Sequence, residues 1–208
     1  AKSMGLYVVV SDGSKSAPGL LIADDYFISS TYDIELTVFL AKQYHENIRP
    51  IDGVICVASD IPLTVASVAL ELGIPGIPIS AAKLAMDKLE MKKCFYKDGL
   101  PVPWFSPVES VNELRNFVYQ TPHQIVIKPV DSRGSRGVLL LNKDLDLSEA
   151  YQKSHGYSPT GRVMVERFLS GPQVSTESLV INGEVYTPGF ADRNYDMMEK
   201  FSPIIIEN

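Results

Sequence analysis

The chain has 208 residues, of which 45% are hydrophobic and 21% charged, and its formal net charge is −6. This is an ordinary globular composition whose acidic balance argues against nucleic-acid binding, and its two cysteines, Cys56 and Cys94, are too few for a disulfide framework or a cysteine metal site. No apolar run approaches the ~18 residues of a membrane span and no signal peptide is visible, so we expect a cytoplasmic protein without a membrane partner.

Two short apolar runs within the first 60 residues have the pattern of buried strands. Leu6–Val10 and Val54–Val57 are rich in β-branched residues and are continuous rather than alternating, as in a parallel sheet. Cys56 lies in the second run and is expected to be a core thiol. Ser11–Gly19 has the composition of a loop. Because residues 1–5 lead directly into a strand, we expect the chain to begin inside its first structural unit.

Helical patterns alternate with these strands. Ile34–Tyr44 has apolar residues at helical spacing, and Asp60 and Pro62 begin a second helix that Gly73 ends. The alternation of strand and helix is typical of a Rossmann-like, doubly wound α/β unit, which we place at residues 1–78.

The rest of the chain predicts a mixture of helices and strands. The expected helices are a long one over Ser80–Lys97, one through Tyr119 that starts at the capping box Ser110–Glu113, and a short one over Asp146–Ser154. Pro101–Pro107 is extended by its prolines. The expected strands flank Lys128 and cover Val163–Glu166, Pro203–Ile206 and a hairpin over Ser178–Tyr186 that turns at Asn182-Gly183.

The segment QIVIKPVDSRGSRGVLLL, residues 124–141, carries the strongest chemical signal. Lys128 ends an apolar strand, where an ammonium needs an anion or water. The loop that follows offers flexible backbone N–H groups, hydroxyls and two guanidinium groups: Ser132, Arg133, Gly134, Ser135, Arg136 and Gly137. Without a ligand, the same residues would be a lysine that extends to solvent and a solvated hairpin tip. Their joint occurrence favours a phosphate site.

Two other nucleotide motifs are absent. The loop Ser132–Gly137 is no Walker A loop, because a strand rather than a helix follows it. Gly13–Ser16 is not one either, because it lacks the Gly-Lys pair. The sequence has no Gly-x-Gly-x-x-Gly fingerprint of dinucleotide-binding proteins either. A second segment, ERFLSGPQ from Glu166, can offer backbone groups to the edge of an adenine ring and apolar side chains to its faces.

Three features occur in the order that the ATP-grasp superfamily has: a helix with a lysine, here Ser80–Lys97 with Lys88, then the strand with Lys128 and its Gly-rich loop, then the Glu-x-x-Leu-x-Gly segment from Glu166. The chain therefore resembles this superfamily from about Leu6 to its end. The resemblance is nearest to the carbamoyl-phosphate-synthetase-like and L-amino-acid-ligase-like branches, and biotin-carboxylase-like and D-alanine-ligase-like enzymes are more distant. It implies an α/β unit followed by an α+β unit, that is, a partial Rossmann-like pre-ATP-grasp domain and an incomplete ATP-grasp fold. The implied parts are residues 1–78, a helical linker and A subdomain at 79–120, the lid at 121–171 and the start of the C-terminal subdomain at 172–208.

The resemblance also implies roles for single residues. Lys88 and Lys128 would contact the ATP phosphates, and Glu166 would bind the adenine amino group. Backbone groups of Arg167, Phe168 and Leu169 would assist. Gln173 stands where the family has a ribose-binding glutamate, and a glutamine can still hydrogen-bond a diol. Glu177, on the same strand, is a further candidate for the nucleotide site.

The sequence matches fewer of the family's metal-binding and catalytic residues than of its ATP-binding residues. The family holds magnesium on a late acidic strand, and Glu207-Asn208 falls too early in the domain for it. We therefore expect this segment near the acyl-acceptor site, with metal binding by Glu207 as the alternative, and we expect the Mg²⁺ ligands beyond Asn208. Asp192 and Arg193 are expected near the γ-phosphate or the substrate, with Arg193 as the catalytic candidate. A charged turn is the alternative interpretation of this pair.

The implied activity is an ATP-dependent ligase reaction, in which a carboxylate is phosphorylated to an acyl phosphate that an amine or another nucleophile attacks. The expected partners are ATP and small carboxylate and amine substrates, and homodimerisation is left open. A different class, a non-catalytic ATP-binding module for regulation or assembly, is the alternative, and it would lack the late metal-binding residues. A nicotinamide-dependent oxidoreductase would account for the first 75 residues but for nothing after Ser80.

Overall fold

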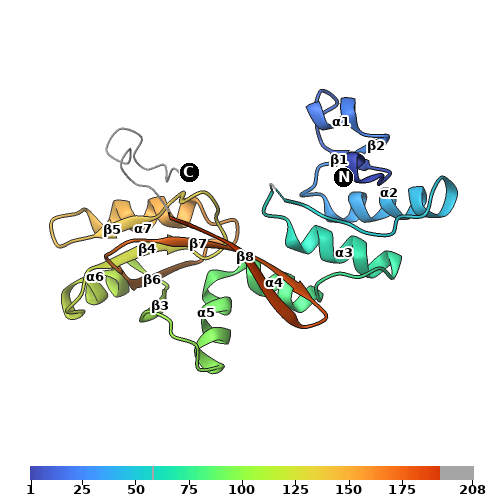
Figure 1. Cartoon of the computed structure of the whole chain (residues 1–208). Coiled ribbons are helices and arrows are strands. Elements are labelled where there is room, and N and C mark those ends of the chain that lie inside the picture. The colour runs from blue at the N-terminus through green and yellow to red at the C-terminus, as the bar shows by residue number, and fades with distance from the viewer. Residues whose placement is uncertain (58, 193–208) are drawn as a thin grey trace. The chain divides into compact units, whose positions relative to one another are not determined.

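The computed structural model describes residues 1–57 and 59–192. The chain forms two compact units, residues 1–91 and residues 92–208 (Figure 1). No helix in the described ranges is both long and apolar enough to cross a membrane. The division into four parts that the sequence suggests stays a prediction.

The first unit contains a short parallel sheet. β1 (Val9–Asp12) pairs with β2 (Asp25–Ile28), with Val9 opposite Asp25, and the helix α1 (Pro18–Ile22) connects them. A 3-10 turn, η1 (Lys2–Met4), precedes the sheet. The predicted strand Leu6–Val10 therefore begins too early, because Leu6 and Tyr7 are 56% and 46% exposed and only residues from Val9 on have a ladder partner.

Three helices complete this unit: α2 (Ile34–Asn47), α3 (Pro62–Leu72) and α4 (Ile79–Met86). The backbone N–H of Leu36 donates to the side chain of Asp33, which caps α2. Pro62 begins α3, and Gly73 ends it at φ 64°, a left-handed conformation that glycine adopts readily. The predicted helices Ile34–Tyr44 and Asp60–Leu72 are thus confirmed.

The predicted strand Val54–Val57 is wrong. The segment has no strand pairing, and Ile55 and Val57 are 82% and 88% exposed. Cys56 is only partly buried and is not a core thiol. A β-branched run favours extended backbone, but a strand also needs a neighbour for its ladder hydrogen bonds, and no described segment supplies one here.

The long helix predicted over Ser80–Lys97 is two helices in the structure. Asp87 separates α4 from α5 (Lys88–Lys97) with an extended backbone, φ −119° and ψ 104°. Its Oδ1 accepts hydrogen bonds from the backbone N–H groups of Leu89 and Glu90, both at 3.0 Å. The apolar residues keep their helical spacing through Asp87, so the sequence predicts one helix. The side chain of Asp87 binds the first N–H groups of α5 and thereby starts a new helix.

The second unit is built around a four-stranded sheet of β3 (Phe105–Val108), β4 (Ile125–Pro129), β5 (Leu139–Leu141) and β6 (Val163–Arg167). The strand order is β3-β6-β4-β5 and every neighbouring pair is antiparallel. The strands β4 and β5 form the predicted hairpin, and the Gly-rich loop connects them.

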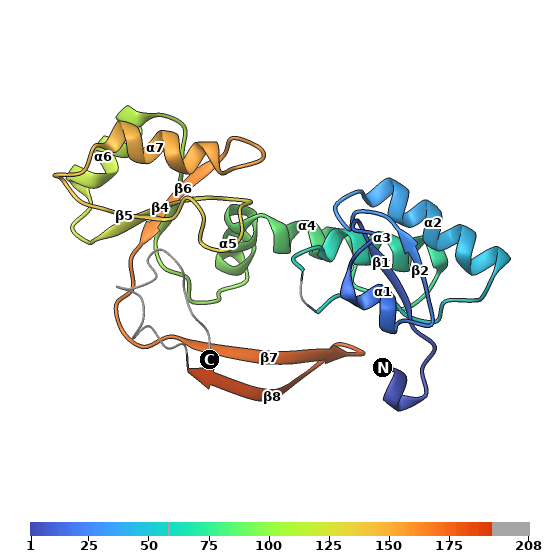
Figure 2. The same ribbon diagram turned by 90° about the horizontal axis from the view of Figure 1, so that it is seen from above.

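Two helices, α6 (Val111–Gln120) and α7 (Leu147–Gly156), lie on one side of this sheet (Figure 2). The side chains of Ser110 and Asp146 cap them, as the sequence predicts. The core between helices and sheet contains Leu114, Leu147, Ile125, Ile127, Val163 and Val165. Because side chains alternate along a strand, Val126, Lys128, Met164 and Glu166 belong to the opposite face.

The last described elements are β7 (Val174–Ile181) and β8 (Glu184–Asp192), which pair only with each other as a long ribbon (Figures 1 and 2). They turn at Asn182 and Gly183, whose φ angles are 52° and 83°. This confirms the predicted Asn-Gly hairpin, which is longer than expected. The predicted strand Pro203–Ile206 lies outside the described residues.

Candidate functional site

The four-stranded sheet brings Lys128 and Glu166 together. Val126 on β4 lies directly opposite Glu166 on β6, and Lys128 follows two residues later on the same face. The two charged side chains are therefore diagonal neighbours, within reach of each other. Lys128 Nζ donates a hydrogen bond to Glu166 Oε1. Only 18% of the Lys128 side chain and 12% of the Glu166 side chain are exposed.

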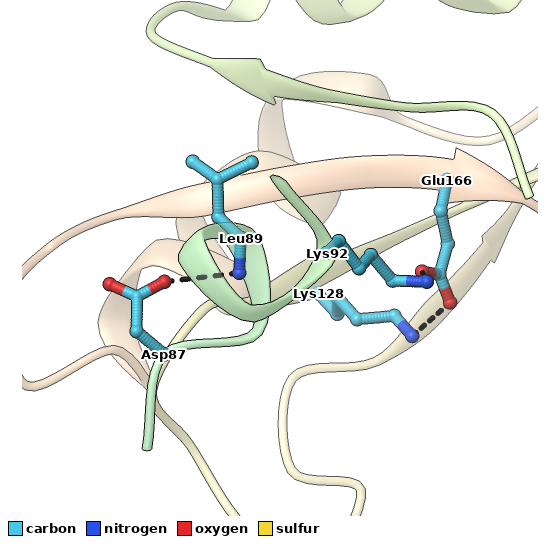
Figure 3. A network of polar contacts seen from close by, with 5 residues as sticks. All are labelled: Asp87, Leu89, Lys92, Lys128 and Glu166. Carbon is cyan, nitrogen blue, oxygen red and sulfur yellow. Dashed lines mark hydrogen bonds and ion pairs between the residues drawn. The ribbon is translucent and has the colours of Figure 1, made fainter. Parts of the chain in front are cut away.

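A second lysine, Lys92 of α5, reaches the other carboxylate oxygen. Its Nζ lies 2.8 Å from Glu166 Oε2, and Figure 3 shows both ammonium groups against the one carboxylate. The Lys92 ammonium also lies 5.9 Å from the ring centre of Phe105, which is the residue opposite Glu166 on β3. We call Lys92, Lys128 and Glu166 the lysine–glutamate cluster.

The sequence analysis missed Lys92. The available signal was its spacing, because Lys92 follows Lys88 by one helical turn and shares its side of α5. Lys88 is the first residue of α5, directly after the capping residue Asp87, which Figure 3 shows beside Leu89. The proposed phosphate contact of Lys88 stays a prediction.

The cluster carries a surplus positive charge. Burial by itself raises the pKa of Glu166, but the charge of Lys128 and the contacts with both lysines outweigh it and hold this pKa below its ordinary value of 4.5. Glu166 is therefore ionised at neutral pH, and it compensates only one of the two ammonium groups. A largely buried site in which the described residues supply one carboxylate for two ammonium groups favours an anionic ligand.

The carboxylate of Glu166 is occupied in this structure. Oε1 accepts the hydrogen bond from Lys128. Oε2 is shielded from solvent and has the ion pair with Lys92, although it accepts no hydrogen bond of good geometry. An adenine amino group that binds Glu166 would therefore share this carboxylate with the two lysines.

The loop Ser132–Gly137, which we call the phosphate loop, has an unusual backbone. Gly134, Ser135 and Gly137 have φ angles of 61°, 56° and 73°. A positive φ is strained for a non-glycine residue such as Ser135, and such strain concentrates at functional sites. Within the described ranges, the N–H groups of these three residues donate no hydrogen bond. Open N–H groups in a left-handed turn form an anion-binding concavity.

The segment after Glu166 leaves one backbone donor open. The N–H of Arg167 donates to the Trp104 carbonyl at 2.8 Å, and that of Phe168 donates to the Gln124 carbonyl at 2.9 Å. The N–H of Leu169 makes no such bond to any described residue, and the Leu169 side chain is exposed. If this segment reads an adenine edge, Leu169 is its N–H donor, and Arg167 and Phe168 can contribute only carbonyl oxygens.

The other predicted site residues lie elsewhere. Gln173 precedes β7, and Glu177 is exposed on β7, opposite Gly189 in the two-stranded ribbon. Arg193, Glu207 and Asn208 lie outside the described residues, and Asp192 is the last residue of β8. In residues 1–57 and 59–192, no three acidic, histidine or cysteine side chains are grouped to hold a metal ion.

No protein-family model matches the sequence. The chain is 29% identical over 140 residues to the D-alanine–D-alanine ligase of Gloeobacter violaceus, a match that covers 64% of the chain and 45% of that ligase. It aligns with the crystal structure of the L-amino acid ligase from Bacillus licheniformis with a TM-score of 0.74 and 22% identity, over 92% of the chain and 45% of that protein.

A second similar structure is the biotin carboxylase domain of the Hydrogenobacter thermophilus 2-oxoglutarate carboxylase, in complex with MgADP, ADP and bicarbonate. Its TM-score is 0.73 at 18% identity, over 92% of the chain and 46% of that domain. The chain thus spans less than half the length of each of these three proteins. The expected carbamoyl-phosphate-synthetase-like branch is not singled out by these matches and stays a prediction. The order of the elements, the sheet with its Gly-rich loop and the structural matches together show that the chain has a partial ATP-grasp fold.

Proposed function

We propose that the full-length protein is an ATP-dependent carboxylate–amine ligase. The observation that carries this proposal is the lysine–glutamate cluster, in which Lys92 and Lys128 share the single carboxylate of Glu166 in a largely buried position. Its surplus charge suits a polyphosphate. The names of the similar D-alanine–D-alanine ligase and L-amino acid ligase support amino acids as the class of substrate.

The cluster suggests how ATP would enter. Lys128 would leave Glu166 Oε1 for a phosphate oxygen, which offers it a stronger negative charge. The freed Oε1 would then accept a hydrogen bond from the adenine amino group. Lys92 would stay on Oε2 and keep Glu166 ionised during the exchange. One carboxylate and two lysines would in this way serve both ends of the nucleotide.

The reaction would then proceed in two steps. An oxygen of the substrate carboxylate attacks the γ-phosphorus, the bond to the β-phosphate oxygen breaks, and ADP leaves. The amine attacks the carbonyl carbon of the acyl phosphate, and inorganic phosphate leaves with the electron pair of the broken C–O bond. Lys128 and the N–H groups of the phosphate loop would neutralise and orient the phosphates. The described residues do not provide a fitting magnesium site, so no step is assigned to a metal, and Arg193 stays a proposed catalytic residue.

A thermal-shift measurement tests the binding step. ATP at about 100 times its Kd should stabilise the full-length wild-type protein by about 2.7 kcal/mol, and Lys128→Ala should remove this protection. Lys153→Ala, which replaces an exposed lysine of α7, is the matched control and should keep it. Unchanged protection of Lys128→Ala would sink the assignment of the phosphate site.

The ligase step needs a second measurement. Incubation with ATP and candidate amino acids should release ADP, and hydroxylamine should trap an acyl phosphate as a hydroxamate when the amine is omitted. ATP binding without any substrate-dependent release of ADP, over a broad set of carboxylates, would instead favour the non-catalytic module.

A further inference from the structure

Asp131 is an acidic residue at the start of a loop that is otherwise suited to anions. It follows Val130, directly after β4, and a carboxylate at this place would repel a polyphosphate if it faced the same way as the loop N–H groups. In the structure, the Asp131 carboxylate is bound by Ser158 and Thr160. Asp131 Oδ1 accepts a hydrogen bond of 2.6 Å from Ser158 Oγ. Asp131 Oδ2 accepts from Thr160 Oγ1 at 2.6 Å and from the Thr160 N–H at 3.1 Å.

These donors come from the connection between α7 and β6, which is itself tied to the sheet. The Arg162 N–H donates to Ser158 Oγ at 2.9 Å, and the Val130 N–H donates to the Arg162 carbonyl at 3.1 Å. Ser158 is buried. The carboxylate of Asp131 is therefore held by three donors on a segment that is fixed to the end of β4.

The same connection also holds the other end of the loop. Gly137 is buried at φ 73°, and a Cβ atom there would lie 2.9 Å from Pro129 Cγ and 3.0 Å from Tyr157 Cβ. Only a residue without a side chain fits so closely against Tyr157. Asp131, directly before the phosphate loop, and Gly137, its last residue, thus both contact residues 157–160.

We propose that Asp131, held by Ser158 and Thr160, is a positioning residue that keeps the N–H groups of the phosphate loop directed at the ATP phosphates. This inference rests on the proposed ATP site. Its physical basis is preorganisation, because a loop that is fixed before binding loses less conformational entropy when phosphate binds. The three hydrogen bonds also fix the position of the Asp131 carboxylate.

Thr160 offers a matched pair of variants. Thr160→Val keeps the shape of the side chain and removes the hydroxyl donor to Asp131, whereas Thr160→Ser keeps the hydroxyl. Isothermal titration calorimetry on the full-length protein should compare ATP with adenosine, which lacks the phosphates. Thr160→Val should weaken ATP binding about threefold to tenfold, as for the loss of one ordinary hydrogen bond, and leave adenosine binding unchanged. Thr160→Ser should retain wild-type affinity for both ligands.

Asp131→Ala is the stronger change and should weaken ATP binding more than tenfold at unchanged affinity for adenosine. Asp144→Ala, which removes an exposed carboxylate between β5 and α7, is its control and should bind both ligands normally. Equal losses for ATP and adenosine, or wild-type affinity of Thr160→Val for ATP, would overturn the positioning role while the ATP site stands. Failure of the wild-type protein to bind ATP would overturn the proposed function and this inference with it.

Discussion

At the scale of single residues, Glu166 determines the electrostatics of the site. An isolated carboxylate in a largely buried position would be protonated easily, but two ammonium groups stabilise its charged form. The same contacts link this residue to folding, because the unfolded chain lacks both lysine contacts. The free energy of unfolding should therefore depend on the ionisation of Glu166.

Glu166→Gln tests this link. Because the pKa of Glu166 is lower in the folded protein than in the unfolded chain, the unfolded state binds more protons near that pH, and the stabilisation is complete above about pH 4.5 and lost as the pH falls through the folded value. Glu166→Gln should reduce the free energy of unfolding by about 3 kcal/mol at pH 7, since it leaves two lysines without their counter-ion. Urea unfolding between pH 3 and 7 measures the difference, which should shrink in acid. A difference that does not change with pH would contradict the ionised cluster.

Some of these residues were predictable and others were not. Lys128, with the Gly-rich loop after it, is singled out by the strand pattern, whereas Glu166 is singled out only by the resemblance to the ATP-grasp superfamily. Lys92 lies among other lysines of a polar helix, and its spacing of one turn from Lys88 is too weak a signal to distinguish it from a solvated lysine. Its role depends on where α5 lies against the end of β6, which is a tertiary fact.

At the scale of elements, capping overrides periodicity at Asp87. The apolar spacing of Ser80–Lys97 continues through this residue, but its carboxylate binds the N–H groups of Leu89 and Glu90 and separates α4 from α5. As a result, Lys88 occupies the first turn of a new helix rather than the middle of a long one.

A pair of substitutions at Asp87 tests the capping interaction. Asp87→Ala should lower the free energy of unfolding by about 1 kcal/mol, because the first N–H groups of α5 lose their acceptor. Asp87→Asn should stay within a few tenths of a kcal/mol of wild type, since asparagine caps about equally well. Chemical unfolding measures both. Equal losses for alanine and asparagine would show that the charge of Asp87, and not its cap, is what matters.

The elements also differ in how well local sequence predicts them. The helices α2, α3, α6 and α7 have caps or stop signals that act within one turn, and each was predicted close to its observed bounds. Val54–Val57 has strand-like residues, yet it forms no strand because pairing needs a neighbouring backbone. For the same reason β2 went unnoticed, since its short segment Asp25–Ile28 becomes a strand only beside β1.

At the scale of the whole molecule, the lysine–glutamate cluster and the phosphate loop belong to one unit. Lys92, Lys128, Glu166 and the phosphate loop all lie in residues 92–208. The helices α2 and α3 belong to the other unit. Binding of ATP should therefore leave a localised signature along the chain.

Hydrogen exchange with mass spectrometry can map this signature on the full-length protein. ATP should slow exchange in peptides that cover the phosphate loop and residues 166–170, because the open N–H groups of Gly134, Ser135, Gly137 and Leu169 would acquire acceptors. Peptides from α2 serve as the internal reference and should not change. Protection that is confined to α2, with none in the loop, would contradict the site.

The sequence by itself determined the local features of this protein: the helix caps, the Asn-Gly turn, the lysine at a strand end and the Gly-rich loop after it. These features depend on residues a few positions apart, where steric and hydrogen-bonding preferences act directly. Only the tertiary structure decided that Lys92 and Lys128 share Glu166, that Asp131 turns toward Ser158 and Thr160, and that Val54–Val57 remains unpaired. Each of these depends on segments that are distant in sequence, and their contact energies exist only after the strands and helices have packed.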